Sequence, residues 1–451
     1  MKKTIVPIFV ALLSGTMFVN AEESTSTVED LENYHRSSMS MITVVHPADS
    51  FCNEIKQAVL EMPFPEKYDK HDLGFTFVEG TPHADRKADL TSELDIFMQK
   101  QQVAKRMVAS WFGFDGKSFN LDLIRERGQY DASVEDAQMA LQTVRGKAML
   151  DDAGEELLGK TFFLVNDISY IDHKQRAEIA SEGARVTGEA AEAVGDAAGE
   201  ILGLFGGIGK SVGGLVKATG SLAKTGGDLV AGITDLLNIS GFVVRINTYL
   251  YQLEWNDSIA SVFYEKYYTM GVDSLEDSAK VAAFLADTST FKMKFVGKHD
   301  QLTDKGTLYS KKSQEEQMLV TCTRTLDKNI VNLQRKYPDF QVKVPIYEVV
   351  YNEKGKVEGC RAHVGLKEGI TEKTKFSLLE KSISDDGRTV YKKVGTLKPV
   401  KGQICDNRYM AAEELMETGD AGAAALQGTL LKGSKKVMPG MLIMEGDYKE
   451  K

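Results

Sequence analysis

The side chains that most often carry catalysis or bind metals are few in this sequence and widely spaced. Its 451 residues include 7 histidines and 4 cysteines. No two histidines are three or four residues apart, and no Cys-x-x-Cys pair occurs, so the spacing typical of a metal site is missing. The histidines are His35, His46, His71, His83, His173, His299 and His363. These patterns predict neither a metal nor another cofactor.

Carboxylates are the remaining candidates for acid–base chemistry. Asp167 follows Asn166 at the end of a predicted strand, where ligands bind in helix-covered sheets, although a turn cap is the favoured alternative. A second group lies at a predicted helix end with no histidine nearby, so a solvated face is favoured over an acid–base pair. That group is Asp151, Asp152, Glu155 and Glu156. A hydrolase would need a deep apolar pocket with a histidine or paired carboxylates of shifted pKa, and we predict no such pocket.

The N-terminus has the pattern of an export signal. A basic start at Lys2 and Lys3 precedes an apolar run over residues 5–13, and small residues up to Ala21 suit a signal peptidase. No cysteine stands at the predicted cleavage site directly after the apolar run, which argues against a lipoprotein. We therefore expect an exported protein of the periplasm or outer-membrane periphery of a Gram-negative-type bacterium. The formal net charge of −10 argues against nucleic acid as a partner.

Hydrophobic periodicity predicts an α+β fold. An exported α/β domain over residues 37–337 would follow a signal peptide (1–21) and a flexible leader (22–36), and a small antiparallel β barrel or sandwich would occupy 340–451. Within the first domain we expect strands at 39–46, 118–124, 161–171 and 242–253, a short extended segment at 291–296, and helices at 48–62, 85–111, 134–150, 257–267, 275–286 and 313–337. In the second, strands are expected at 342–351, 362–364, 375–379, 390–397 and 437–444.

A glycine-rich insertion over residues 174–240 interrupts the first domain and contains a seven-residue repeat. Glycine recurs at one heptad position, and Ile or Leu recurs two residues later. On a helix these residues would form a small-residue face and an apolar seam, so we expect contact with a membrane or with another helix. The contact residues are Gly199, Gly206, Gly213, Gly220, Gly227, Ile201, Phe205, Ile208, Val212, Leu215, Leu222 and Leu229.

Two other interpretations of the insertion were weighed. A flexible linker is disfavoured by the regular Ile or Leu position. A phosphate-binding loop at Gly209-Lys210-Ser211 is rejected because its required first glycine is Leu204, so no nucleotide is expected. An interior glycine costs a helix roughly 0.5–1 kcal/mol relative to alanine, so the repeat must gain stability from close packing.

The order of these parts resembles the envelope proteins of the curli-secretion-channel family. The similar stretches are Phe119-Asn120-Leu121 leading to Arg125, residues 153–168, and the long helix at 313–337. Related flagellar-assembly proteins add a small barrel that contains two spaced glycines followed by a hydrophobic strand. Gly365 and Gly369, followed by the strand at 376–379, resemble this pattern. The resemblance implies a non-catalytic part of an envelope assembly or secretion apparatus, and it transfers no catalytic residue.

The functional prediction is a non-enzymatic cell-envelope protein, an assembly, secretion or scaffold component. Its partners would be other envelope proteins or further copies of itself, with membrane surface contact through the insertion. The alternative is a periplasmic hydrolase whose residues converge only in three dimensions. Cys52 and Cys322 are expected to be buried thiols, whereas Cys360 and Cys405 fall in one β-rich region and could form a disulfide.

Overall fold

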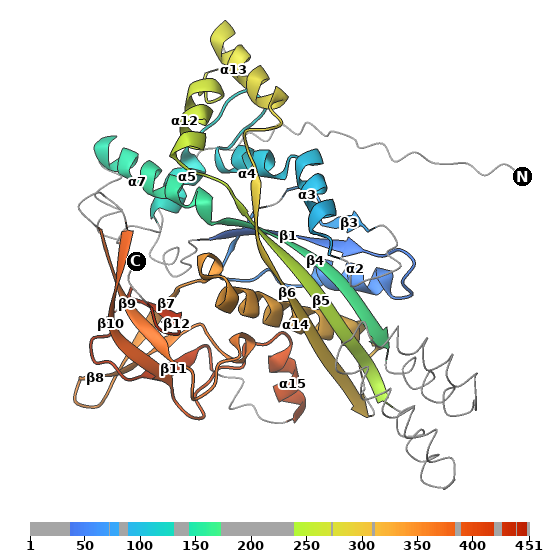
Figure 1. Ribbon diagram of the computed structural model, residues 1–451. Coiled ribbons are helices and arrows are strands. Elements are labelled where there is room, and N and C mark those ends of the chain that lie inside the picture. The colour runs from blue at the N-terminus through green and yellow to red at the C-terminus, as the bar shows by residue number, and fades with distance from the viewer. Residues whose placement is uncertain are drawn as a thin grey trace, which may run out of the picture.

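The chain folds into a helix-covered mixed sheet followed by a closed ring of six antiparallel strands (Figure 1). The computed structural model describes residues 37–71, 73–80, 89–129, 144–172, 239–271, 274–308, 312–383, 389–418, 426–438 and 440–448. The α+β class predicted from the sequence is confirmed.

The mixed sheet has the strand order β2-β1-β4-β5-β6, and β3 also pairs with β1. Its strands are β1 (Ser38–Val45), β2 (Asp69–Lys70), β3 (Phe77–Glu79), β4 (Thr161–Asp172), β5 (Ile239–Leu253) and β6 (Met293–Leu308). β1 runs parallel to β2, β3 and β4, whereas β5 and β6 add to β4 as antiparallel strands. Parallel pairing buries both faces of a strand, and almost every residue of β4 is buried.

Two helical layers cover the sheet. The upper layer in Figure 1 packs on a core that includes Trp111, Phe163 and Phe263. Its helices are α3 (Thr91–Lys100), α4 (Val103–Trp111), α5 (Asp122–Gln129), α12 (Asp257–Lys266) and α13 (Leu275–Ala286), with α7 (Val144–Glu156) packed against α5. The lower layer consists of α2 (Cys52–Glu61) and α14 (Gln314–Lys336), packed on the opposite face. Ser313 and Glu316 form a capping box that fixes the start of α14.

Several predicted elements differ from the structure. The helix expected at 85–111 is broken, because Gln102 adopts a left-handed conformation (φ 51°) between α3 and α4. The strand expected at 118–124 is wrong: the Asn120 side chain accepts a hydrogen bond from the backbone N–H of Asp122, and α5 begins there. Such a bond favours a helix start over extended backbone. β6 continues to Leu308, well beyond the short extended segment predicted at 291–296.

The second part of the chain forms the closed ring, in the order β10-β11-β8-β7-β12-β9. Its strands are β7 (Val344–Tyr351), β8 (Val357–Ala362), β9 (Phe376–Ile383), β10 (Thr389–Pro399), β11 (Thr429–Lys432) and β12 (Leu442–Glu445), and the short helix α15 (Ala411–Thr418) lies between β10 and β11. The strand predicted at 362–364 is misplaced, since β8 ends at Ala362. Alternate residues such as Ile346, Leu378 and Ile443 fill the interior.

A buried polar junction joins the ring to α14. Glu368, in the 3₁₀ turn Leu366–Glu368, receives hydrogen bonds from the Lys67 ammonium (2.5 Å), the Gly365 backbone N–H (2.7 Å) and the Asn407 amide (2.9 Å). Arg335 of α14 donates to the Glu368 carbonyl at 2.7 Å. The turn therefore connects the two parts through charge-assisted hydrogen bonds, which are stronger than neutral ones.

Steric constraints explain the two glycines beside this turn, Gly365 and Gly369. A Cβ atom on Gly365 would lie 2.2 Å from the carbonyl oxygen of Cys405, and Gly369 has a φ of +65° that favours glycine. The sequence pattern at Gly365 and Gly369 thus has a local structural explanation.

Helices α5 and α7 cross unusually closely at two glycines. A Cβ on Gly128 would lie 1.8 Å from the Leu150 carbonyl oxygen, and one on Gly154 would lie 1.8 Å from the Ile124 carbonyl oxygen. Each glycine therefore accommodates the backbone of the other helix, as small residues do in tightly crossed helix pairs.

Candidate functional site

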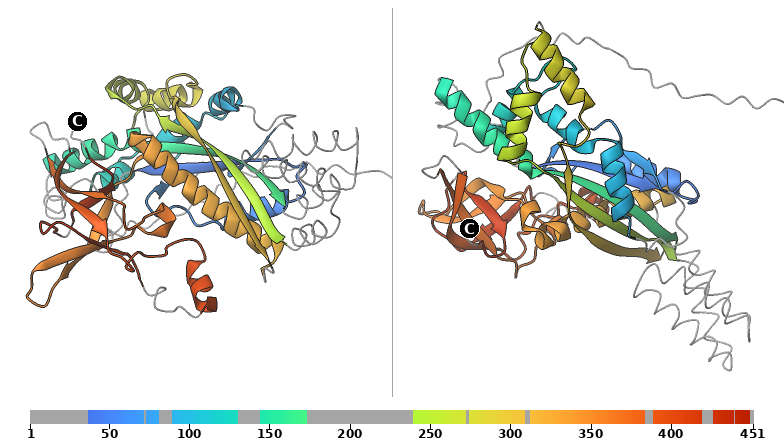
Figure 2. Two further views of the ribbon diagram at one scale, coloured as in Figure 1. Left: turned by 60° about the horizontal axis from the view of Figure 1, so that its bottom comes forward. Right: turned by 45° about the horizontal axis from the view of Figure 1, so that its top comes forward.

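The glycine heptads lie outside the described residues, but the structure places both ends of the insertion. Asp172, the last residue of β4, pairs with Phe242 of β5. The far ends of β4, β5 and β6 extend as a twisted ribbon beyond the upper helices (Figure 2). The intervening chain must therefore leave and return at adjacent points at the tip of this ribbon.

The four cysteines are buried free thiols in the structure. Cys360 lies inside the ring, where burial raises the pKa of its thiol to about 12. Cys405 Sγ donates a hydrogen bond to the Leu426 carbonyl at 2.8 Å. The disulfide between Cys360 and Cys405 stays a prediction.

A cavity opens at the outer edge of β1. β2 pairs with Ser38 and Met39, and β3 pairs with Thr43 to Val45, so residues 40–42 have no described strand partner on this side. His71, Leu73, Phe75 and Thr76 lie beside this gap and, together with β1, line a pocket of about 190 Å³. Its apolar lining comes from β1, α2, β4 and the loops that follow α2 and β2. It comprises Met41, Ile42, Val59, Leu60, Met62, Phe64, Leu73, Phe75 and Phe163.

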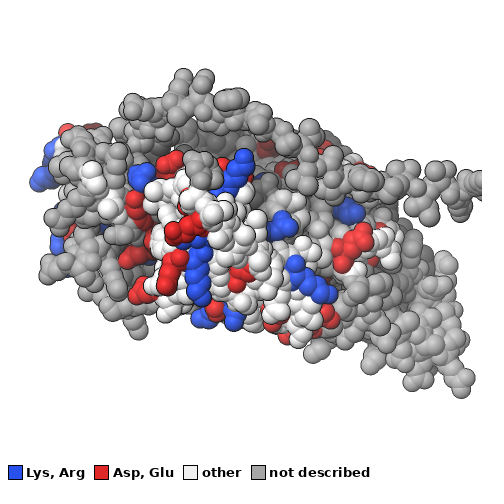
Figure 3. Space-filling model, turned by 90° about the horizontal axis from the view of Figure 1, so that it is seen from above, with Lys and Arg blue, Asp and Glu red and all other residues white. Residues whose placement is uncertain are grey.

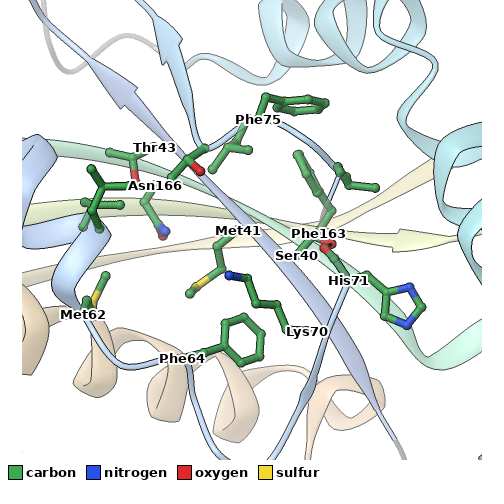
Figure 4. Close-up of a pocket in the computed structure, with 15 residues that line it drawn as sticks. Ser40, Met41, Thr43, Met62, Phe64, Lys70, His71, Phe75, Phe163 and Asn166 are labelled. Carbon is green, nitrogen blue, oxygen red and sulfur yellow. Dashed lines mark hydrogen bonds between the residues drawn. The ribbon is translucent and has the colours of Figure 1, made fainter. Parts of the chain in front are cut away.

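Figure 4 shows the polar side chains of the pocket beside its apolar wall. Lys70 reaches into the pocket beside Met41 and Phe64, and Asn166 points into it from β4 (Figure 4). The His71 ring points away from Met41 and Phe64, and it packs on Trp111 with 4.9 Å between ring centroids. The pocket thus combines one ammonium, one amide and the hydroxyl residues Ser40, Thr43 and Thr76 with its apolar wall.

Hydrogen bonds within the pocket wall do not activate a nucleophile. The Ser40 hydroxyl donates to the backbone carbonyl of His71, not to its ring. Burial lowers the pKa of His71 to about 4, so the imidazole is neutral at physiological pH. Packing against Trp111 desolvates His71, but its ring points away from the apolar wall of the pocket (Figure 4), so the expected absence of a deep apolar pocket with a histidine of shifted pKa stays a prediction.

A second polar group lies where β1 ends. His46 Nε2 and Asp167 Oδ1 are 2.8 Å apart, and both residues are buried. Arg245 of β5 forms an ion pair with Asp300 of β6 on the same face of the sheet. The sequence indicated Asp167 but missed His46, which lies 121 positions away. Its place directly after a buried parallel strand was the available signal.

The carboxylate cluster of α7 has structural partners instead of a fully solvated face. Asp151 pairs with Arg125 of α5 at 3.0 Å, and Glu155 accepts a hydrogen bond from Tyr264 of α12 at 3.0 Å. These contacts join three helices of the upper layer. They explain the positions of Asp151 and Glu155 without catalysis.

The described residues include no group of three or more His, Cys, Asp or Glu side chains arranged to hold a metal ion. Neither His46 nor His71 is hydrogen-bonded through its ring to a hydroxyl or thiol in the described ranges. Residues 209–213 have the Gly-x-Ser-x-Gly spacing of a hydrolase nucleophile turn, but they belong to the heptads and lie outside those ranges.

The molecular surface and the comparisons do not select a partner. Acidic and basic side chains are interspersed on the face seen from above (Figure 3). In the portion that the structure describes, no helix combines the length and apolar character required to span a bilayer. No protein-family model matches the chain, and no curated protein matches it significantly.

Proposed function

We propose that this protein is a non-enzymatic cell-envelope component that presents its glycine-heptad insertion to a membrane surface or to another copy of itself. The observation that carries the proposal is the pairing of Asp172 with Phe242, which holds the two ends of the insertion side by side at the tip of the ribbon. An insertion attached in this way can project from the sheet without interrupting it.

The remainder of the molecule suits a scaffold. The junction at Glu368 and the ion pair between Arg324 of α14 and Glu414 of α15 (2.9 Å) join the ring to the α/β part. Contacts that fix two parts of a chain favour a defined spatial relation between them. The resemblance to envelope assembly and secretion proteins agrees with this role, and export to the periplasm belongs to the same proposal.

The decisive variant replaces residues 173–241 by Asn-Gly, a two-residue turn suited to an antiparallel hairpin. Because β4 and β5 already pair directly, the sheet should fold without the insertion. We expect the variant to lose vesicle flotation, oligomer mass or both, measured with phosphatidylethanolamine–phosphatidylglycerol liposomes and by light scattering. Unchanged behaviour in both assays would contradict the proposal.

A second variant separates the two kinds of contact. Alanine at Gly199, Gly206, Gly213, Gly220 and Gly227 keeps the apolar seam but prevents close backbone approach. Contact between copies predicts that this variant loses oligomer mass. Contact with lipid predicts that flotation persists, because alanine favours a helix more than glycine does.

A further inference from the structure

The pocket at the open edge of β1 has donors that lack acceptors. Lys70 is exposed at the rim, and its ammonium has no acidic partner among the described residues. Asn166 is only 2 % exposed, and no described residue accepts a hydrogen bond from its Nδ2. A buried amide donor normally has an acceptor, so an unpaired one directed into a cavity points to a ligand.

A chain of hydrogen bonds fixes the orientation of the Asn166 amide. Asn329 of α14 donates through Nδ2 to the Ile246 carbonyl (3.0 Å) and to Thr248 Oγ1 (2.7 Å). Because the Thr248 hydroxyl oxygen accepts from Asn329, its single hydrogen is donated to Asn166 Oδ1, 2.7 Å away. With Oδ1 used as the acceptor, Nδ2 is left to donate into the pocket.

The size and lining of the pocket restrict its ligand. A cavity of 150 Å³ in another protein holds benzene, so about 190 Å³ accommodates a ring or a short chain with one polar head. Met41, Met62 and Phe64 provide the apolar wall, and methionine adapts readily to different shapes. An ammonium and an amide NH₂ both donate, so the polar head must accept hydrogen bonds and is best matched by a negative charge.

We propose that this pocket binds a small monocarboxylate with an apolar body, its carboxylate held by Lys70 and Asn166 and its body against Met41, Met62 and Phe64. This site is independent of the glycine heptads and goes beyond the proposed scaffold role. It would couple the envelope component to a soluble organic acid.

The test measures binding of hexanoate and phenylacetate to the full chain. Calorimetric titration gives the affinity, and the methyl NMR signals of labelled methionine report the site. We expect saturable binding at one site that shifts a small subset of the methionine signals. Hexanamide, the neutral analogue, should bind at least 10-fold more weakly, because charge-assisted hydrogen bonds are the stronger ones.

Two variants locate the site, with a matched control. Lys70→Met should weaken hexanoate binding about 10–100-fold, whereas Lys56→Met on α2 should leave it unchanged. Asn166→Asp keeps an acceptor for Thr248 but places a negative charge in the pocket, so it should weaken binding at least as much. Circular dichroism checks that each variant is folded.

Three outcomes would overturn this site: no binding of either acid at millimolar concentration, equal binding of hexanamide, or equal effects of Lys70→Met and Lys56→Met. The hairpin variant that lacks residues 173–241 should still bind hexanoate. Failure of the scaffold proposal and failure of this one are therefore distinguishable.

Discussion

Gly154→Ala is expected to destabilise the protein by about 3 kcal/mol, although alanine is the better helix former. The added methyl would meet the Ile124 carbonyl oxygen at 1.8 Å, and a backbone atom cannot rotate away as a side chain can. The helices α5 and α7 must therefore separate, with loss of the contact at Gly128. The gain in helix propensity, roughly 0.5–1 kcal/mol, offsets only part of this cost.

Urea unfolding of the variants measures the effect. Gly159→Ala is the matched control, because its Cβ would have only the Trp255 carbonyl oxygen nearby, at 3.8 Å, and should be neutral or slightly stabilising. Gly128→Ala should resemble Gly154→Ala, and the double variant should cost less than the sum, since the helices are already apart after one substitution. Equal stability of Gly154→Ala and Gly159→Ala would refute the close crossing.

Glu368→Gln is expected to cost about 3 kcal/mol of unfolding free energy at neutral pH, because it leaves the largely buried Lys67 ammonium without its counter-charge. The control is Glu358→Gln on β8, whose pair with Lys432 is far more exposed and should contribute less than about 1 kcal/mol. Chemical denaturation of both variants against wild type gives the comparison. A similar loss in the two would show that burial at the junction has no special effect.

The same residue predicts a pH dependence. Burial raises the pKa of the Glu368 carboxyl, but the Lys67 charge and the hydrogen bonds from Asn407 and Gly365 outweigh burial and leave the pKa below its usual value. A carboxyl with a lowered pKa in the folded state stabilises the protein above its unfolded pKa, and this stability is lost as the pH falls through the folded value. The stability difference between wild type and Glu368→Gln should therefore shrink as the pH falls below the usual pKa of a glutamate carboxyl. A difference that grows on acidification would contradict this assignment.

The sequence predicted those helices and strands whose hydrophobic pattern agrees with their burial in the folded protein. Residues 162–165 of β4 are continuously apolar because this strand is central, and α13 has the predicted bounds because Ser274 and Asp277 form a capping box. The capping box at Ser313 likewise marked the start of α14. In such segments local preference and tertiary packing agree, so pattern and structure coincide.

The remainder depended on contacts that the sequence does not display. β6 carries charges such as Asp300 and Asp304, which are suited to a solvent-facing edge, so no apolar alternation marked it as a strand. The left-handed Gln102 had no local signal, since glutamine rarely adopts that conformation. Near the candidate site, the sequence indicated Asp167 for its position. Asn166, Lys70 and the relay through Thr248 and Asn329 depend instead on pairing across four separate elements.

The pairing of β4 with β5 also has a kinetic consequence. These neighbours in the sheet are separated by residues 173–238, which is 238 − 172 = 66 positions of chain. Closing a loop of that length costs about 3 kcal/mol more entropy than closing a two-residue turn, from the (3/2)RT ln n dependence. The hydrogen bonds between β4 and β5 can form only after this entropy cost of loop closure has been met. Refolding of wild type should therefore be slow at this step. Most of the delay should vanish in the variant that lacks residues 173–241.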